Sequence, residues 1–197
     1  MPNILSGEEY AGGRFITYPS IAGKNKAWFA VYVQVRHEKE VYSRFQKKSI
    51  DCFLPLLEKW SKRKDRRKKI WTPLFPGYVF VNTILDNYTN VEILRTQGVV
   101  WILKNSEGPL PIPDYQIESL RKILDNQMII RPHPYLREGE MVKVVNGPLA
   151  GCVGILLKKN DKKGKLVASI DIIKKAVSVE LNIDDVEPVN IVFGHNP

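Results

Sequence analysis

The chain has 197 residues, and its 30 Lys and Arg outnumber its 21 Asp and Glu, for a formal net charge of +9. A hydrophobic content of 44% is ordinary for a folded protein and excludes full disorder. The longest uncharged run, Ile70 to Leu85, contains two prolines and a glycine, so we expect neither a membrane-spanning helix nor a membrane partner.

The first half of the chain alternates strand and helix patterns after an irregular start. Residues 1–27 mix Gly, Ser, Pro and charges without a lasting period, which predicts a flexible tail. The pattern then predicts strands at 28–35, 52–57, 69–82 and 99–103, and helices at 37–50, 86–96 and 114–124. This βαββαβ order with a final helix predicts a ferredoxin-like α+β domain over residues 28–126.

The second half of the chain has a different pattern, with short strand-like segments and no helical period. Two prolines in Arg131-Pro132-His133-Pro134 favour extended backbone, so we predict a linker over residues 127–136. Short β-branched segments separated by Gly-Pro, Lys-Gly-Lys and Lys-Lys turns follow it. They predict a small SH3-like β-barrel over residues 137–197.

Positive charge is concentrated in one short segment. Residues 58–70 hold 8 basic and 2 acidic groups, and the predicted strands place this segment at the tip of a hairpin. Such a run is usually a solvated loop. However, eight positive charges within 13 residues repel one another, and a polyanion partner would relieve this repulsion. The basic residues of the tip that we predict to bind nucleic acid are Lys62, Arg63, Lys64, Arg66, Arg67, Lys68 and Lys69.

Two stretches carry a family resemblance. WFAVYVQVRHEKEV, PLFPGYVFV and TQGVVWIL resemble the N-terminal domain of the NusG family of bacterial transcription elongation factors. LREGEMVKVVNGPLAGCVGIL resembles the KOW motif of that family's C-terminal barrel. The segment HEKEVYSRFQKKSIDCFLP resembles specialised paralogues, such as the antiterminators of capsule and exopolysaccharide operons, more than it resembles the housekeeping factor.

The predicted strand pairing clusters several aromatic or rigid side chains, which fit either an ordinary core or an exposed pocket. The resemblance implies a pocket that binds the clamp helices of the largest RNA polymerase subunit. The Pro-Gly break beside Phe75 would turn the neighbouring rings outward, which favours the pocket, because aromatic anchors concentrate binding energy. The predicted polymerase-binding residues are Trp28, Phe29, Phe75, Pro76 and Tyr78.

The first helix carries a second basic patch, made by Arg36, Arg44, Lys47 and Lys48. A plain solvated helix face is the alternative to a binding role. The resemblance implies that this patch contacts non-template DNA and that the hairpin tip contacts upstream DNA. Trp60 and Trp71 flank the basic run and are able to stack on bases.

The resemblance also implies a protein partner for the barrel. Leu149 stands where housekeeping members often present Phe to the termination factor Rho or to a small-subunit ribosomal protein. Leu keeps an apolar contact with the ribosomal protein possible and argues against Rho.

Nothing in the sequence supports catalysis, a metal or a cofactor. The three histidines are scattered, the two cysteines lie in no motif, and Asp184-Asp185 is typical of a surface turn. Cys52 and Cys152 match no disulfide framework, which favours a reduced, cytoplasmic compartment.

The sequence therefore predicts a monomeric, non-enzymatic factor that promotes elongation or antitermination, on specific long operons. Three alternatives remain open: a housekeeping elongation factor, a KOW-containing ribosomal or ribosome-assembly protein, and an enzyme acting on nucleic acid. The ribosomal alternative leaves the FPGYVFV stretch unexplained, and the enzyme needs a cluster of carboxylates for a divalent metal, which the sequence does not show.

Overall fold

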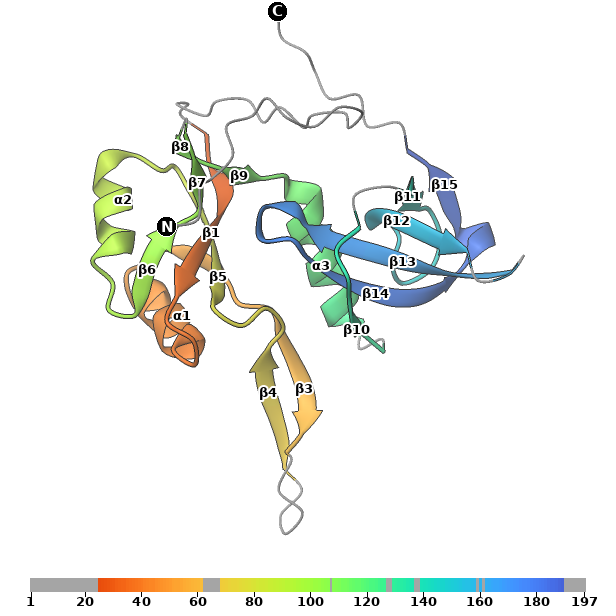
Figure 1. Ribbon diagram of the computed structural model, residues 1–197, viewed down its shortest axis with the longest axis horizontal. Helices are drawn as coiled ribbons and strands as arrows, with labels where there is room; N and C mark the ends of the chain where they lie inside the picture. Colours follow the sequence, from red (N-terminus) through yellow and green to blue (C-terminus); the bar gives the residue numbers. More distant parts are fainter. Residues whose placement is uncertain are drawn as a thin grey trace, which may run out of the picture.

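The computed structural model describes residues 25–61, 68–106, 108–126, 129–136, 139–158, 160 and 162–189. Figure 1 shows a strand-and-helix unit at the N-terminal side, a strand-rich unit at the C-terminal side and helix α3 between them. The predicted N-terminal tail lies outside the described residues, apart from its last three positions.

The N-terminal unit is built on an antiparallel sheet in the order β2-β5-β1-β6. This order is that of a ferredoxin-like fold, so the predicted fold class is confirmed. β1 lies at the centre because its side chains are almost all buried. The strands are β1 (Ala27–Val33), β2 (Asp51–Phe53), β5 (Tyr78–Thr83) and β6 (Val99–Ile102).

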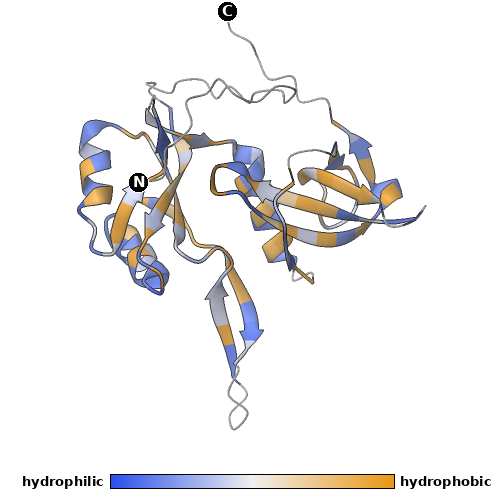
Figure 2. Ribbon diagram, viewed as in Figure 1, coloured by the Kyte–Doolittle hydropathy of each residue, from blue (hydrophilic) through white to orange (hydrophobic). Residues whose placement is uncertain are grey.

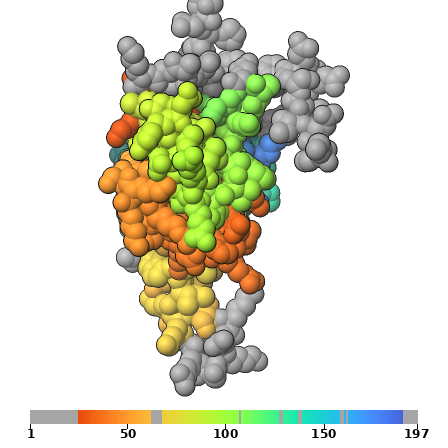
Figure 3. Space-filling model, turned by 90° about the vertical axis from the view of Figure 1, so that its left-hand side faces the viewer, coloured from red at the N-terminus to blue at the C-terminus, as the bar shows by residue number. Residues whose placement is uncertain are grey.

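Two helices, α1 (Glu38–Lys47) and α2 (Asn87–Leu94), cover one face of this sheet. Val41 and Phe45 of α1 and Ile93 of α2 are fully buried in a core with alternate residues of β1 and β5. Asp86 caps α2, because its carboxylate accepts the Thr89 N–H at 2.7 Å. In Figure 3 the two helices lie next to each other on this side, with the hairpin below them.

The predicted strand over residues 52–57 is wrong as a single element. Pro55 has no N–H to continue the ladder, so the chain leaves the sheet after Phe53 and starts a separate two-stranded hairpin. The hairpin strands are β3 (Leu56–Trp60) and β4 (Lys69–Pro73). They project away from the sheet, and only short connections join them to it (Figure 1).

Short strands that the sequence analysis did not predict lead into the third helix. A small hairpin follows β6, and β9 then pairs with β1 along the same edge as β6. These elements are β7 (Lys104–Asn105), β8 (Gly108–Pro109), β9 (Pro111–Ile112) and α3 (Asp114–Asp125). Within the described ranges, no helix combines the length and the apolar character needed to cross a membrane.

The C-terminal unit is an antiparallel, barrel-like sheet in the order β10-β14-β13-β12-β11-β15. Figure 2 shows hydrophobic and hydrophilic residues alternating along its strands, as expected where one side faces a core. Its strands are β10 (Arg131–His133), β11 (Glu140–Val144), β12 (Val153–Lys158), β13 (Lys163–Ile170), β14 (Lys175–Asn182) and β15 (Val186–Pro188), with short 3-10 turns η1 (Asp171–Ile173) and η2 (Ile183–Asp185). Part of the predicted linker is therefore a strand, because β10 pairs with β14.

Helix α3 lies across one end of the barrel and is tied to it by hydrogen bonds. Near its start, the amide Nε2 of Gln116 donates to the Asp171 carboxylate at 2.7 Å, and Gln116 Oε1 accepts the Asp171 N–H at 3.1 Å. In its middle, Ser119 Oγ accepts the Val153 N–H at 2.8 Å. Near its end, Lys122 Nζ donates to the Ala150 carbonyl at 2.8 Å. The helix and the barrel therefore share one continuous hydrophobic core.

Replacing Ser119 by Ala tests this contact. We expect the free energy of unfolding to fall by about 1–2 kcal/mol, because the Val153 N–H loses its acceptor in a mostly dry interface. Burial raises the pKa of the neighbouring Cys152 thiol to about 11, so loosening the contact should also speed its reaction with a thiol reagent. Urea unfolding and thiol-labelling rates measure both effects. Ser43→Ala, on the exposed side of α1, serves as the control. Equal free energies of unfolding and equal labelling rates in the two variants would show that the Ser119–Val153 hydrogen bond does not stabilise the interface.

Candidate functional site

The face of the sheet opposite α1 and α2 is lined with aromatic rings. Successive residues of a strand point to opposite sides, so the even-numbered residues of β1 share this face with alternate residues of its neighbours. Its aromatic members are Trp28, Tyr32, Phe53, Tyr78, Phe80 and Trp101. We call this surface the aromatic face.

Helix α3 covers one end of the aromatic face. The Arg121 guanidinium carbon lies 4.6 Å from the centre of the Trp28 ring and 4.9 Å from that of Phe53. These distances are typical of cation–π contacts. Ile117 and Leu120 of the same helix belong to the core that contains Trp28. This end of the face is therefore closed to a partner while α3 is in place.

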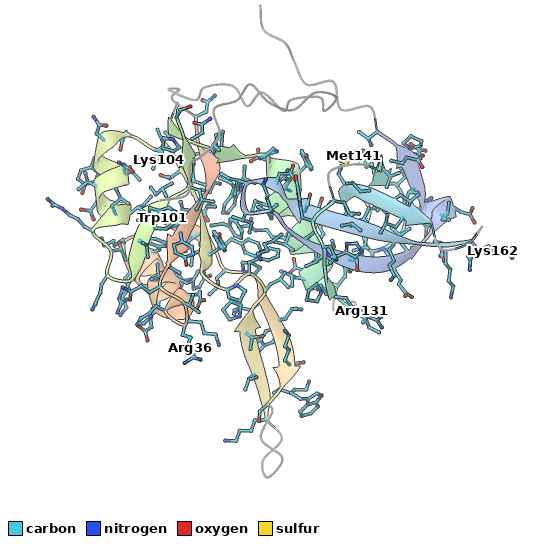
Figure 4. All side chains as sticks on the ribbon, viewed as in Figure 1. Arg36, Trp101, Lys104, Arg131, Met141 and Lys162 are labelled. Carbon is cyan, nitrogen blue, oxygen red and sulfur yellow. The ribbon has the colours of Figure 1, made fainter. Side chains whose placement is uncertain are left out.

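The other end of the aromatic face is open. Tyr32 stacks on Trp101 with ring centres 4.7 Å apart and meets Tyr78 edge to face at 5.4 Å. Trp101 is 51% exposed, and Figure 4 shows it on β6, away from the barrel. Partial burial and the nearby Tyr32 raise the pKa of Tyr78, which keeps its hydroxyl neutral and able to donate a hydrogen bond. A rigid, partly solvated aromatic cluster of this kind fits a protein partner.

The structure separates the aromatic residues that the sequence analysis grouped together. Tyr78 lies at the open end and Pro76 on the exposed turn before it, but Trp28 and Phe75 are only 5% and 4% exposed. Phe29 is not part of the surface: it lies in the core under α1 and α2, because it alternates with Trp28 along β1. Tyr32 and Trp101 were missed, although the same alternation, continued from Trp28, would have found Tyr32.

A groove of about 1080 Å³ lies between the β3–β4 hairpin and the beginning of α1. Its lining combines cations with exposed apolar surface: Trp60 and Trp71 are 63% and 54% exposed. Arg36 adopts a left-handed backbone conformation (φ +74°), which is uncommon outside glycine and is found at functional sites. The basic residues of the groove are Arg36, Lys39, Lys59 and Lys68, and its apolar residues are Val35, Trp60, Ile70, Trp71, Pro73 and Pro76.

The tip of the hairpin continues the positive charge of the groove. Lys69 Nζ lies 3.0 Å from the Glu58 carboxylate and 5.9 Å from the centre of the Trp60 ring, so this lysine also braces the two strands. Lys68 lines the groove. The remaining basic residues predicted at the tip, Lys62, Arg63, Lys64, Arg66 and Arg67, lie outside the described residues.

The basic patch of α1 divides into two pairs. Arg44 donates to the Gln97 carbonyl at 2.7 Å, and Lys48 Nζ pairs with the Glu92 carboxylate at 3.1 Å, so both join α1 to the segment running from α2 to β6. For Arg36 and Lys47, the described part of the chain offers no ion-pair partner. Arg36 points away from α1 on the side of the hairpin (Figure 4).

Leu149 is buried, with 3% of its surface exposed. It lies in the loop between β11 and β12, whose Pro148 and Ala150 carbonyls accept hydrogen bonds from Asn126 and Lys122 at the end of α3. The residue predicted to contact a partner of the barrel is therefore packed beneath the barrel's own contact with α3.

The described residues contain no group of three or more His, Cys, Asp or Glu side chains arranged to hold a metal ion. Burial, reinforced by the nearby Asp51, raises the pKa of the Cys52 thiol to about 11. Burial likewise raises the pKa of Cys152 to about 11. Both thiols are thus protonated and weak nucleophiles near neutral pH.

Alanine substitutions in the α1 patch should separate its two pairs. We expect Arg44→Ala and Lys48→Ala each to lower the free energy of unfolding by about 0.5–1 kcal/mol, since each removes a partly solvated contact between α1 and the α2–β6 segment. Lys47→Ala should stay within about 0.5 kcal/mol of the wild type. Denaturant unfolding measures all three, and a loss at Lys47 as large as at Arg44 would contradict this division.

Comparisons with known proteins identify relatives of this chain. A family model described as "Transcription termination factor nusG" matches residues 26–121. The chain is 30% identical over 142 residues to the transcription termination/antitermination protein NusG of Escherichia coli K12, which covers 70% of this chain and 77% of that protein. It is 26% identical over 175 residues to the protein of the same name from Pseudomonas aeruginosa, covering 83% of this chain and 99% of that protein.

A solved structure described as "Domain interaction in Thermotoga maritima NusG" superposes with a TM-score of 0.49 and 19% identity, over 84% of this chain and 98% of that chain. The identity with the Escherichia coli protein, and the share of that protein that is covered, place this chain in a family of transcription factors. The chain belongs to the NusG family, and it is a NusG-like transcription factor.

Proposed function

We propose that this factor binds RNA polymerase through the open end of the aromatic face while its hairpin and groove hold DNA. The observation that carries the proposal is the stack of half-buried Tyr32 on exposed Trp101, joined by half-buried Tyr78, at an uncovered end of the sheet. A soluble protein rarely exposes such a cluster unless a partner covers it.

The clamp helices of the largest polymerase subunit fit this surface by their chemistry. A helix offers a row of apolar side chains at a regular spacing, and the open end offers an aromatic surface on which the Tyr32 and Tyr78 hydroxyls are potential hydrogen-bond donors. Pro76 and Tyr78 remain in the proposed contact, while Tyr32 and Trp101 replace Phe29. Trp28 lies at the covered end of the same face, and Phe75 packs edge to face against Phe80, so neither belongs to the proposed contact.

DNA is the partner proposed for the basic groove and the hairpin. The cations of the groove suit a phosphate backbone, and exposed tryptophans next to them suit unpaired bases, which stack on aromatic rings whatever their sequence. We assign the non-template strand to the groove that Arg36 lines and to Lys47 at the end of α1, and the upstream duplex to the tip. Arg44 and Lys48 act mainly by fixing α1 in position.

Holding polymerase and DNA together explains how such a factor acts on elongation. A factor that binds the closed, elongating polymerase more tightly than the paused form shifts the population toward elongation by the ratio of the two affinities. Such an effect requires no chemistry, which agrees with a cytoplasmic, monomeric and non-enzymatic factor.

The barrel is proposed to bind a small-subunit ribosomal protein through the loop that carries Leu149. Since α3 covers this loop, the partner must displace the contacts of Lys122 and Asn126 before it reaches Leu149. Rho is not proposed as a partner, because the aromatic ring expected at this position is absent.

Polymerase binding is tested by truncating the open end of the aromatic face. We expect Tyr78→Ala and Trp101→Ala each to weaken binding to core RNA polymerase by about tenfold or more, as for central aromatic anchors of an interface. Tyr88→Ala is the control, since Tyr88 is 76% exposed on α2. Fluorescence-detected titration measures the affinities, and unchanged affinity in variants that melt normally would refute the assignment. Phe75→Ala is less informative, because removing a buried ring also costs about 3–5 kcal/mol of stability.

DNA binding is tested through its salt dependence. Replacing Arg66, Arg67, Lys68 and Lys69 by Ser should reduce the slope of log affinity against log salt by about 3, since each phosphate contact contributes roughly 0.7–0.9. Replacing Lys162 and Lys163, at the far end of the barrel in Figure 4, should leave the slope unchanged. An identical slope in the hairpin variant would exclude the tip as a DNA contact.

The specialised role is tested by mapping the tagged protein on the genome together with RNA polymerase. We expect occupancy to be confined to one or a few long operons, as the similarity of the first helix to specialised paralogues indicates. Occupancy that follows polymerase across most genes would instead establish the housekeeping alternative. Occupancy that is absent from DNA but present in ribosomal fractions would favour the ribosomal alternative.

A further inference from the structure

The turn between β4 and β5 forms a wall of both proposed binding sites. Pro76 lines the DNA groove on one side of this turn. On the other side, the Tyr32 ring lies against Gly77, where an added Cβ would stand 3.1 Å from the ring carbon Cε2. Tyr78, the next residue, makes the edge-to-face contact with Tyr32 at the open end of the aromatic face. One turn therefore faces two partners.

A single buried carboxylate holds this turn. Glu38, at the first turn of α1, is only 3% exposed, and its Oε1 accepts the Gly77 N–H at 2.8 Å. Gly77 has a φ of +85°, and its carbonyl accepts the Val33 N–H at 2.9 Å, so the turn is bonded to both ends of the β1–α1 connection. Glu38 also lines the groove. Its bond to Gly77 thus fixes the distance between the turn and the beginning of α1.

The position of the hairpin follows from the same turn. The β3–β4 hairpin is a sheet of its own, joined to the body through residues 54–55 and 74–77. Leu74 N–H bonds to the Pro55 carbonyl at 2.8 Å, which links the two connections to each other. Any ligand that orders residues 76–78 therefore also orients the hairpin, and with it the width of the groove.

We propose that Glu38 is a positioning residue that couples the two sites, so that a partner on the aromatic face raises the affinity of the groove for single-stranded nucleic acid. The bond between Glu38 and Gly77 ties the turn to the beginning of α1, so a partner that favours one position of the turn also favours one width of the groove. By linkage, nucleic acid in the groove raises the affinity of the aromatic face by the same factor. This inference rests on the proposed function, whose two sites it connects.

The test measures the affinity of the full chain for single-stranded DNA with and without a polymerase fragment on the aromatic face. The ratio of these two affinities reports the coupling. The probes are a fluorescein-labelled DNA single strand of about 12 nucleotides, within the usual site size for such grooves, and a fragment of the largest polymerase subunit that carries the clamp helices. We expect the wild-type chain to bind the strand about fivefold more tightly, or better, when the fragment is saturating. A control without the chain verifies that the fragment does not bind the strand.

Two substitutions at Glu38 separate positioning from charge. Glu38→Ala removes the acceptor of the Gly77 N–H, so the ratio should fall to about one. Glu38→Gln keeps a carbonyl acceptor while removing the negative charge, so it should preserve the ratio even though it raises the absolute affinity for DNA. Thr96→Ala, which removes a hydroxyl that is bonded to the Glu92 carbonyl rather than to the turn, controls for lost stability and should keep the wild-type ratio of affinities.

The outcomes distinguish this inference from the function on which it rests. If neither probe binds the wild-type chain, the proposed function fails and the coupling fails with it. If both probes bind and their affinities are independent, or if Glu38→Ala keeps the wild-type ratio, the function stands and the coupling is overturned. A loss of the ratio in Thr96→Ala as well would also overturn it, because general destabilisation would then explain the effect.

Discussion

The antiparallel pairing of β1 with β5 is the constraint on which the rest of the molecule depends. Its register sets Tyr32 opposite Tyr78 and Val31 opposite Val79. Because neighbouring residues point to opposite faces, the same two strands supply both the core under the helices and the aromatic face. A slip of one residue would exchange these two sets, burying polar groups and exposing valines, so the register and the binding surface are fixed together.

Helix α3 connects the two halves of the molecule by facing in two directions. Arg121 lies over Trp28 and Phe53 of the sheet, while Ser119 and Lys122 bond to the barrel. An amphipathic helix beside one sheet usually leaves its polar side to solvent, but here Gln116 and Ser119 are buried because the barrel covers them. The consequence is that the covered end of the aromatic face and the Leu149 loop of the barrel depend on the same helix.

The basic segment can be recognised in the sequence, whereas the groove beside it is formed only in the tertiary structure. The basic segment at residues 58–70 is visible in the sequence, and so are Trp60 and Trp71 beside it. The groove is not visible there, because Arg36 and Lys39 come from the β1–α1 connection and from α1, which precede the hairpin in the chain. Similarly, the Pro-Gly break at residues 76–77 was recognised as unusual, but the carboxylate that holds it lies 39 residues earlier.

The sequence by itself determined the principal helices and strands, their order and hence the ferredoxin-like fold with its barrel, because the periods of two and 3.6 residues and the Gly and Pro breaks are local signals. Tertiary structure alone decided which side chains remain available. Arg44 and Lys48 are engaged by groups 53 and 44 residues away, Leu149 is covered by α3, and residues 131–133 pair with β14 as a strand. The physical reason is that exposure and pairing depend on what packs against a residue, and the packing partners here are distant in the chain.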